Sequence, residues 1–141
     1  MSVVPQCKVV ARYAWAAPCT VLGLWFAAFA LLVGGRVRWV CGVLEVSWRR
    51  DEDVAPRWER LLSFRAITFG HVVIGASPAQ VAALRDHERV HVRQYERWGV
   101  MLFLAYPISS LVQLVSGRRP YWDNCFEVEA YAVPQNDPPD S

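Results

Sequence analysis

The stretch SPAQVAALRDHERVHVRQYERWG, residues 77–99, predicts one helix with well-defined ends. The Ser77 hydroxyl can accept a hydrogen bond from a free backbone N–H group, and Pro78 suits the first turn because no N–H is needed there. Gly99 favours the end of a helix. We therefore expect a helix from Pro78 to Trp98.

Within this helix, residues 87–91 read His-Glu-Arg-Val-His. Two histidines four residues apart lie on one helical face, where they can bind one zinc ion, and Glu88 beside them can act as a general base. Leu84 and Tyr95 extend the same face, so the imidazoles should point inward. Two alternatives stay open: a solvated surface helix with paired charges, and two core histidines that only make hydrogen bonds.

A hydrolytic zinc site needs a third protein ligand. Metzincins carry Gly and His three and six residues after the second histidine, whereas this chain has Gln94 and Arg97 there, which excludes that class. Gluzincins take a glutamate from a later helix. The segment FEVEAY, residues 126–131, offers Glu127 and Glu129.

With these motifs the sequence resembles the gluzincin type of zinc metallopeptidase, and more closely short bacterial HExxH proteins that share HERVHVRQYERWG and a DN-x-FE-x-EAY segment. The resemblance covers roughly Ile67 to Tyr131. It implies Zn²⁺ held by His87, His91 and Glu127, with Glu129 as the alternate ligand. Tyr131 stands where the family usually has an aspartate that orients a ligating histidine. That departure predicts a weaker hydrogen bond to the histidine.

The geometry of three helices agrees with this ligand set. If a helix over residues 98–116 runs antiparallel beside the first one, a third segment of some seven residues in the direction of the first helix brings Glu127 near the level of His87. The implied reaction is zinc-assisted hydrolysis of a peptide, in which Glu88 takes a proton from the attacking water. Four side chains are candidates for the oxyanion donor: Tyr95, Tyr121, Arg93 and His71. A structural role is the simpler interpretation of His71, and Cys125 fits either a metal ligand or a small buried side chain.

Tyr13 to Gly35 carries no charged residue and, at about 1.5 Å per residue, can cross a hydrocarbon core of about 30 Å. We expect a retained transmembrane anchor over residues 1–35, the alternatives being a signal peptide or a buried core helix. More basic residues follow this segment than precede it, which weakly favours a cytoplasmic location for the catalytic side. The apolar segment Trp98–Gly117 should be a core or interfacial helix, because a second crossing would separate the histidines from Glu127.

Two β-rich stretches lie between the anchor and the zinc helix. Residues 36–47 predict a hairpin about Cys41-Gly42, and residues 65–75 predict one bent strand or a second hairpin. The strand ending near Gly75 could bind an extended peptide by edge pairing. Residues 49–60 predict a charged loop, and residues 134–141 a disordered polar tail.

Composition sets the outer limits of these expectations. The chain has 141 residues, of which 54% are hydrophobic and 20% charged, so one compact unit in contact with membrane lipid is expected. The net charge of +2 with interspersed acidic residues argues against nucleic acid as a partner. Four dispersed cysteines form neither a disulfide framework nor a CxxC site.

The sequence thus predicts an α+β fold in which an N-terminal transmembrane helix precedes a small antiparallel β-meander and a three-helix zincin-like unit, with one domain over residues 36–133. The predicted function is that of a single-pass, membrane-anchored zinc-dependent hydrolase, and more specifically a minimal peptidase. The alternatives are a non-hydrolytic zinc-binding membrane protein and an interaction module in which the HExxH pattern is accidental.

Overall fold

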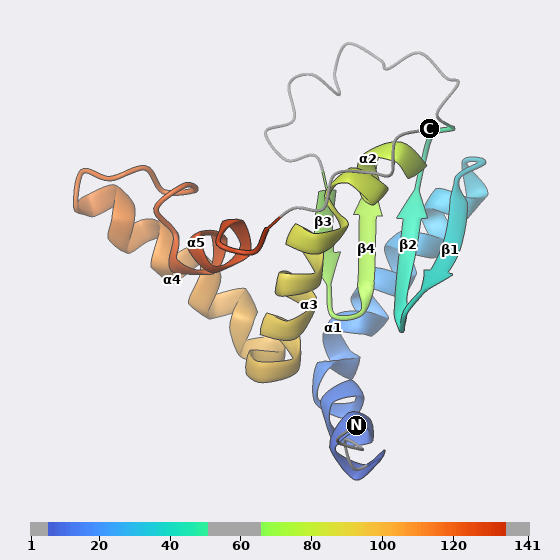
Figure 1. Ribbon diagram of the computed structural model, residues 1–141, viewed down its shortest axis with the longest axis horizontal. Helices are drawn as coiled ribbons and strands as arrows, with labels where there is room; N and C mark the ends of the chain where they lie inside the picture. The colour runs from blue at the N-terminus through green and yellow to red at the C-terminus, as the bar shows by residue number, and fades with distance from the viewer. Residues whose placement is uncertain (1–5, 51–65, 135–141) are drawn as a thin grey trace.

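The computed structural model describes residues 6–50 and 66–134 (Figure 1). Residues 51–60 of the predicted charged loop, and residues 135–141 of the predicted polar tail, lie outside these residues. The described part is α+β, as expected: a long first helix, a four-stranded sheet, and a run of helices after the sheet.

The sheet consists of two hairpins, β1 (Arg36–Val40) with β2 (Val43–Ser47), and β3 (Ala66–Phe69) with β4 (Val72–Gly75). Each hairpin is antiparallel, but the two join through a parallel pairing of β2 with β4, which gives the order β1-β2-β4-β3. The predicted antiparallel meander is therefore wrong. A meander pairs strands in chain order, whereas here β3 lies at the edge and β4 in the middle.

Both hairpins result from their turn residues. Cys41 and Gly42 have φ values of 46° and 82°, and positive φ at both central positions is the requirement of a two-residue type I′ turn. The second hairpin turns at Gly70-His71, so of the two forms predicted for residues 65–75 the hairpin is correct.

Helices cover both faces of the sheet. Helix α1 (Gln6–Leu32) packs Ala27 and Ala30 against Val46, Val72 and Ile74 on one face. On the other face, Val43 and Val73 pack against Val81 and Val92 of the next two helices. Figure 1 shows α1 behind the strands. The predicted boundary at residue 35 therefore does not divide two packed units, because α1 and the sheet share one core.

The predicted helix over residues 78–98 is divided at Leu84 into α2 (Pro78–Ala83) and α3 (Arg85–Trp98). Its predicted ends are confirmed: the Ser77 hydroxyl accepts a hydrogen bond from the Gln80 N–H, Pro78 starts α2, and Gly99 comes directly after the last residue of α3. The break lets α3 begin with Arg85, whose guanidinium donates two hydrogen bonds, of 2.6 and 2.9 Å, to the buried Glu45 of β2. This bidentate pair attaches the start of the HExxH helix to the sheet.

A 3-10 helix η2 (Gly99–Met101) leads into α4 (Leu102–Val115), and a loop returns the chain to α5 (Cys125–Tyr131). The close antiparallel return of α4 along α3 that the sequence predicted is not observed. The two helices instead diverge from η2, and α5 lies in the space between them (Figure 1). Helix α5, rather than α4, packs on α3.

Two stretches of the described chain are long and apolar enough to cross a membrane: Lys8–Leu32, and Arg85–Val115, which runs through α3, η2 and α4. Length and composition thus support association with a membrane. Much of this apolar surface is exposed, in contrast to the small residues with which α1 meets the sheet.

Candidate metal centre

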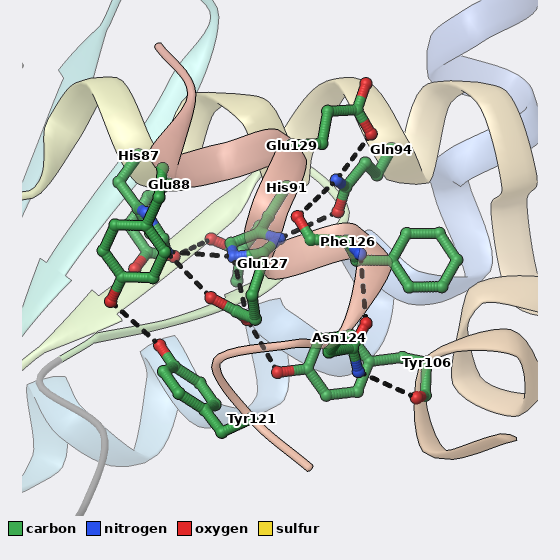
Figure 2. A network of polar contacts seen from close by, with 12 residues as sticks. His87, Glu88, His91, Gln94, Tyr106, Tyr121, Asn124, Phe126, Glu127 and Glu129 are labelled. Carbon is green, nitrogen blue, oxygen red and sulfur yellow. Dashed lines mark hydrogen bonds and ion pairs between the residues drawn. The ribbon is translucent and has the colours of Figure 1, made fainter. Parts of the chain in front are cut away.

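The structure brings three predicted ligands together between α3 and α5. His87 and His91 extend from α3 towards Glu127 of α5 (Figure 2), and their donor atoms lie within 4.8 Å of one another. His87 and Glu127 are buried, and His91 is half-buried. The solvated surface helix is therefore excluded for this face of α3.

The spacing of these donor atoms fits a zinc ion. The two histidine Nε2 atoms are 3.2 Å apart, and Glu127 oxygens lie 3.3 Å from His87 Nε2 and 3.4 Å from His91 Nε2. Ligands placed tetrahedrally about 2.0–2.1 Å from zinc are about 3.3–3.4 Å from one another. Two imidazoles and one carboxylate are also a donor set that zinc accepts, so the residues present fit the ion.

Helix α5 holds Glu127 in place through its N-terminal cap. The Asn124 side-chain oxygen accepts a hydrogen bond from the Phe126 N–H, and its amide donates to the Tyr106 carbonyl and the Ser110 hydroxyl of α4. Asn124 is completely buried. Glu127 lies in the first turn of α5, where a carboxylate is stabilised by the helix dipole. The DN-x-FE segment thus serves to direct this glutamate at α3.

His91 has a hydrogen-bond partner that the sequence did not reveal. Its Nδ1 lies 2.9 Å from the Gln94 side-chain oxygen. A neutral imidazole in this position keeps its proton on Nδ1, which directs the lone pair of Nε2 at a metal ion. The Gln94 amide donates to the Phe126 carbonyl and to Glu129. Glu129, the alternate ligand, therefore points at Gln94 and Arg97 rather than at the histidines.

Tyr131 covers His87 without orienting it. The two rings are 4.4 Å apart at 53°, and the Tyr131 hydroxyl lies 3.3 Å from that of Tyr121. His87 Nδ1 is buried and has no hydrogen-bond partner among residues 6–50 and 66–134. Among the described residues, no carboxylate therefore orients His87 through its Nδ1.

Glu127 is held as a carboxylate. Burial by itself would raise its pKa, but the hydrogen bonds from His87 and Tyr106 and the charge of His91 outweigh burial and hold the pKa below its usual range. The Tyr106 hydroxyl donates to Glu127 over 2.6 Å (Figure 2). An ionised carboxylate is the form that binds a cation.

Glu88 lies beside the ligands in a different environment. It is buried, and Thr68 of β3 donates a 2.7 Å hydrogen bond to one of its oxygens. Burial raises the pKa of Glu88, and the charge of His91 and the Thr68 hydrogen bond offset only part of that rise. A carboxylate with a raised pKa takes up a proton more readily than an ordinary one, which suits a general base.

Of the four candidates for an oxyanion donor, only Tyr121 lies near the ligands, through its contact with Tyr131. Tyr95 is buried in the cluster that joins α1 to α4. Arg93 and His71 line a separate hollow between α1, the hairpin turns and α3. There His71 stacks on Tyr13 and contacts Glu96, a structural role.

Cys125 is exposed, and its sulfur accepts a hydrogen bond from Ser109, so it is not part of this ligand group.

No protein-family model, curated protein or solved structure matches the chain, and the gluzincin resemblance stays a prediction.

Proposed function

We propose that the chain is a zinc-dependent hydrolase that cleaves peptide bonds at a membrane. The observation that carries the proposal is the convergence of His87, His91 and Glu127 from two helices, with Glu88 next to them. Three protein ligands of this type leave one position of a tetrahedral ion open, which is the arrangement of catalytic rather than structural zinc.

Each residue then has a distinct task. When bound, zinc would supply a Lewis acid that polarises a carbonyl and lowers the pKa of water. The Glu88 oxygen that does not face Thr68 takes a proton from the attacking water and returns it to the leaving amine. Thr68 holds the other oxygen, so the carboxylate keeps one orientation. Of the four candidates for the oxyanion donor, Tyr121 is the one near the ligands, and it would donate a hydrogen bond to the developing oxyanion.

The sheet suggests how a peptide is held. The strand that ends at Gly75 is paired on both sides, so the edge predicted there is not available. Among the described residues the edge on this side of the sheet is β3, and Thr68 of β3 contacts Glu88. An extended peptide paired with β3 would run next to the general base.

One observation favours the second candidate, a zinc site that only ties α3 to α5. The ligand side chains of His87 and Glu127 are 5% and 3% exposed, and Tyr131 covers the former. A hydrolase must open this cover to admit a substrate, whereas a structural site need not.

Glu88→Gln separates the two candidates. In a hydrolase this variant retains about one zinc per chain but loses cleavage of a quenched-peptide library by at least about 100-fold, because the proton acceptor is gone. Glu96→Gln, on the same helix but next to His71, is the matched control and should cleave normally. Zinc binding without cleavage by the unaltered protein would leave the structural role. A protein that takes up no zinc would reject both.

A further inference from the structure

Helix α1 contacts the sheet and its turns from Tyr13 to Ala30. Near its start the Tyr13 hydroxyl donates a 2.9 Å hydrogen bond to the Gly42 carbonyl, and Thr20 contacts the turn at His71. In its middle, Gly23 approaches Val72 so closely that an added Cβ would lie 2.7 Å from the valine Cβ. Ala27 and Ala30, which face the sheet, are 3% and 4% exposed. Ala16 and Cys19, both 0% exposed, pack instead in a cluster with Tyr95 of α3 and Leu102 of α4.

This packing conflicts with the single crossing predicted from the sequence. If α1 crossed a bilayer, the sheet bound to it would lie at the same depth. Among the described residues no strand pairs with the outer edges of β1 and β3, and open sheet edges do not occur in hydrocarbon. The ion pair between Glu45 and Arg85 would also enter the membrane.

The outward face of α1 is nevertheless strongly apolar. Trp25 is 75% exposed and Leu32 85%, and both lie on the side of the helix away from the sheet. Further large side chains on this helix are also exposed: Trp15, Leu22, Phe26 and Phe29. A soluble monomer rarely leaves so much contiguous apolar surface in water.

Helix α4 has the same two-sided character. Its polar side chains recur at the spacing of one helical face, and Tyr106, Ser109 and Ser110 of that face contact α5 or the loop before it. Most of the other α4 side chains are apolar and exposed: Phe103, Leu104, Ile108, Leu111, Val112, Leu114 and Val115. Because α5 holds the polar face, α4 cannot turn that face towards lipid or cross a bilayer without it.

The two apolar faces adjoin. Phe69 of β3 lies 5.3 Å from the Phe26 ring of α1 and 6.3 Å from the Phe103 ring of α4. The Trp15 indole of α1 also lies against Gly99, where α3 ends and η2 begins. The exposed side chains of the two helices therefore form one surface, here called the apolar face.

The charges around the apolar face are mostly basic, and the two acidic residues at its border, Glu96 and Asp123, pair with Arg12 and Arg119. No acidic residue precedes Glu45, while Lys8 and Arg12 stand at the start of α1. No acidic residue lies between Glu96 and Asp123, and Arg118 and Arg119 come after the end of α4. Like charges would repel a second copy of this surface, whereas anionic lipid headgroups would attract it.

We propose that α1 and α4 lie in the plane of a membrane, with the apolar face inserted into one leaflet that contains anionic phospholipid. The chain is then bound to one side of the bilayer and does not cross it. This inference rests on the packing of α1 and α4 and is independent of the zinc site.

Cysteine labelling at the two ends of α1 tests the topology. Two variants are needed, each with a single cysteine. One keeps Cys41, which lies beyond the end of α1. The other carries Lys8→Cys before the apolar run together with Cys41→Asn, because asparagine tolerates the positive φ at that turn. In vesicles of known sidedness, an impermeant maleimide should label both positions from the same side. Labelling from opposite sides would show that α1 crosses, which overturns the proposal.

Vesicle flotation tests the partner. Purified protein should float with vesicles of phosphatidylcholine and phosphatidylglycerol, and less with phosphatidylcholine alone. Phe29→Asp on α1 and Leu111→Asp on α4 should each lower the bound fraction at least about tenfold, since each removes an inserted apolar side chain. Ala83→Asp, exposed on α2 beyond the opposite face of the sheet, should bind normally.

Two results would refute membrane binding by this surface. One is flotation that none of the α1 and α4 variants weakens. The other is a protein that does not bind vesicles but forms a dimer that Phe29→Asp dissociates, because the apolar face would then be covered by a second copy of the chain.

Discussion

At the scale of single residues, two glutamates two positions apart on α5 have opposite environments. Glu127 faces His87 and His91, while Glu129 contacts Gln94 and Arg97. We predict that Glu127→Ala lowers zinc occupancy much more than Glu129→Ala, because only the former removes a ligand. Elemental analysis after gentle detergent extraction measures both. Equal losses would mean that Glu127 is not a ligand.

Gln94 supports a second prediction at this scale. Its side-chain oxygen accepts a hydrogen bond from His91 Nδ1. Loss of such a partner from a histidine that binds metal typically lowers the metal affinity by about 10- to 100-fold. Gln94→Leu should therefore weaken zinc binding by roughly this factor, measured by competition with a chromophoric chelator. Gln80→Leu on α2 is the control. Unchanged affinity in Gln94→Leu would show that His91 is oriented by other contacts.

The sequence predicted the residues that converge here but not those that support them. His87, His91 and Glu88 are identified by their spacing on one helix, which local geometry determines. Thr68 and Tyr106 come from β3 and α4, and their approach to Glu88 and Glu127 depends on how distant elements pack. No local pattern marks such partners.

At the scale of helices and strands, short-range signals were again the reliable ones. Turn residues predicted the first hairpin and gave a second hairpin as one of two alternatives for residues 65–75. Ser77, Pro78 and Gly99 predicted helix ends. The parallel pairing of β2 with β4 was missed because it joins strands separated by a long segment and depends on helices that cover both faces. The break at Leu84 was missed because its neighbours are good helix formers.

The packing of α1 makes a prediction for two adjacent alanines. Ala27 is 3% exposed against the sheet, while Ala28 faces outward. Ala27→Leu should destabilise the protein by about 1–3 kcal/mol, because added methylene groups overfill a packed core, and Ala28→Leu should have little effect. Thermal unfolding in detergent compares them. If both substitutions are neutral, α1 does not pack on the sheet in solution.

At the scale of the whole molecule, the layers set where the chemistry takes place. The sheet lies between the second half of α1 and α3, while the first half of α1 contacts α3 directly. Helix α5 lies on the polar face of α4, away from the apolar face. With α1 and α4 in one leaflet, the candidate zinc site would sit above the membrane surface and face water. Its substrates would then be peptide segments near the headgroups.

The shared core also predicts how the protein responds to removal of α1. Deletion of residues 1–35 would release a folded domain if α1 were only an anchor. Here it uncovers Val46, Val72 and Ile74, which are between 0% and 5% exposed, so we expect the shortened chain to lose cooperative thermal unfolding and zinc binding even in detergent. Co-expression of residues 1–35 as a separate chain should restore both, because the contacts of α1 with the sheet are then re-formed. A shortened chain that folds and binds zinc by itself would contradict the shared core, and with it the argument that α1 cannot leave the sheet to cross a bilayer.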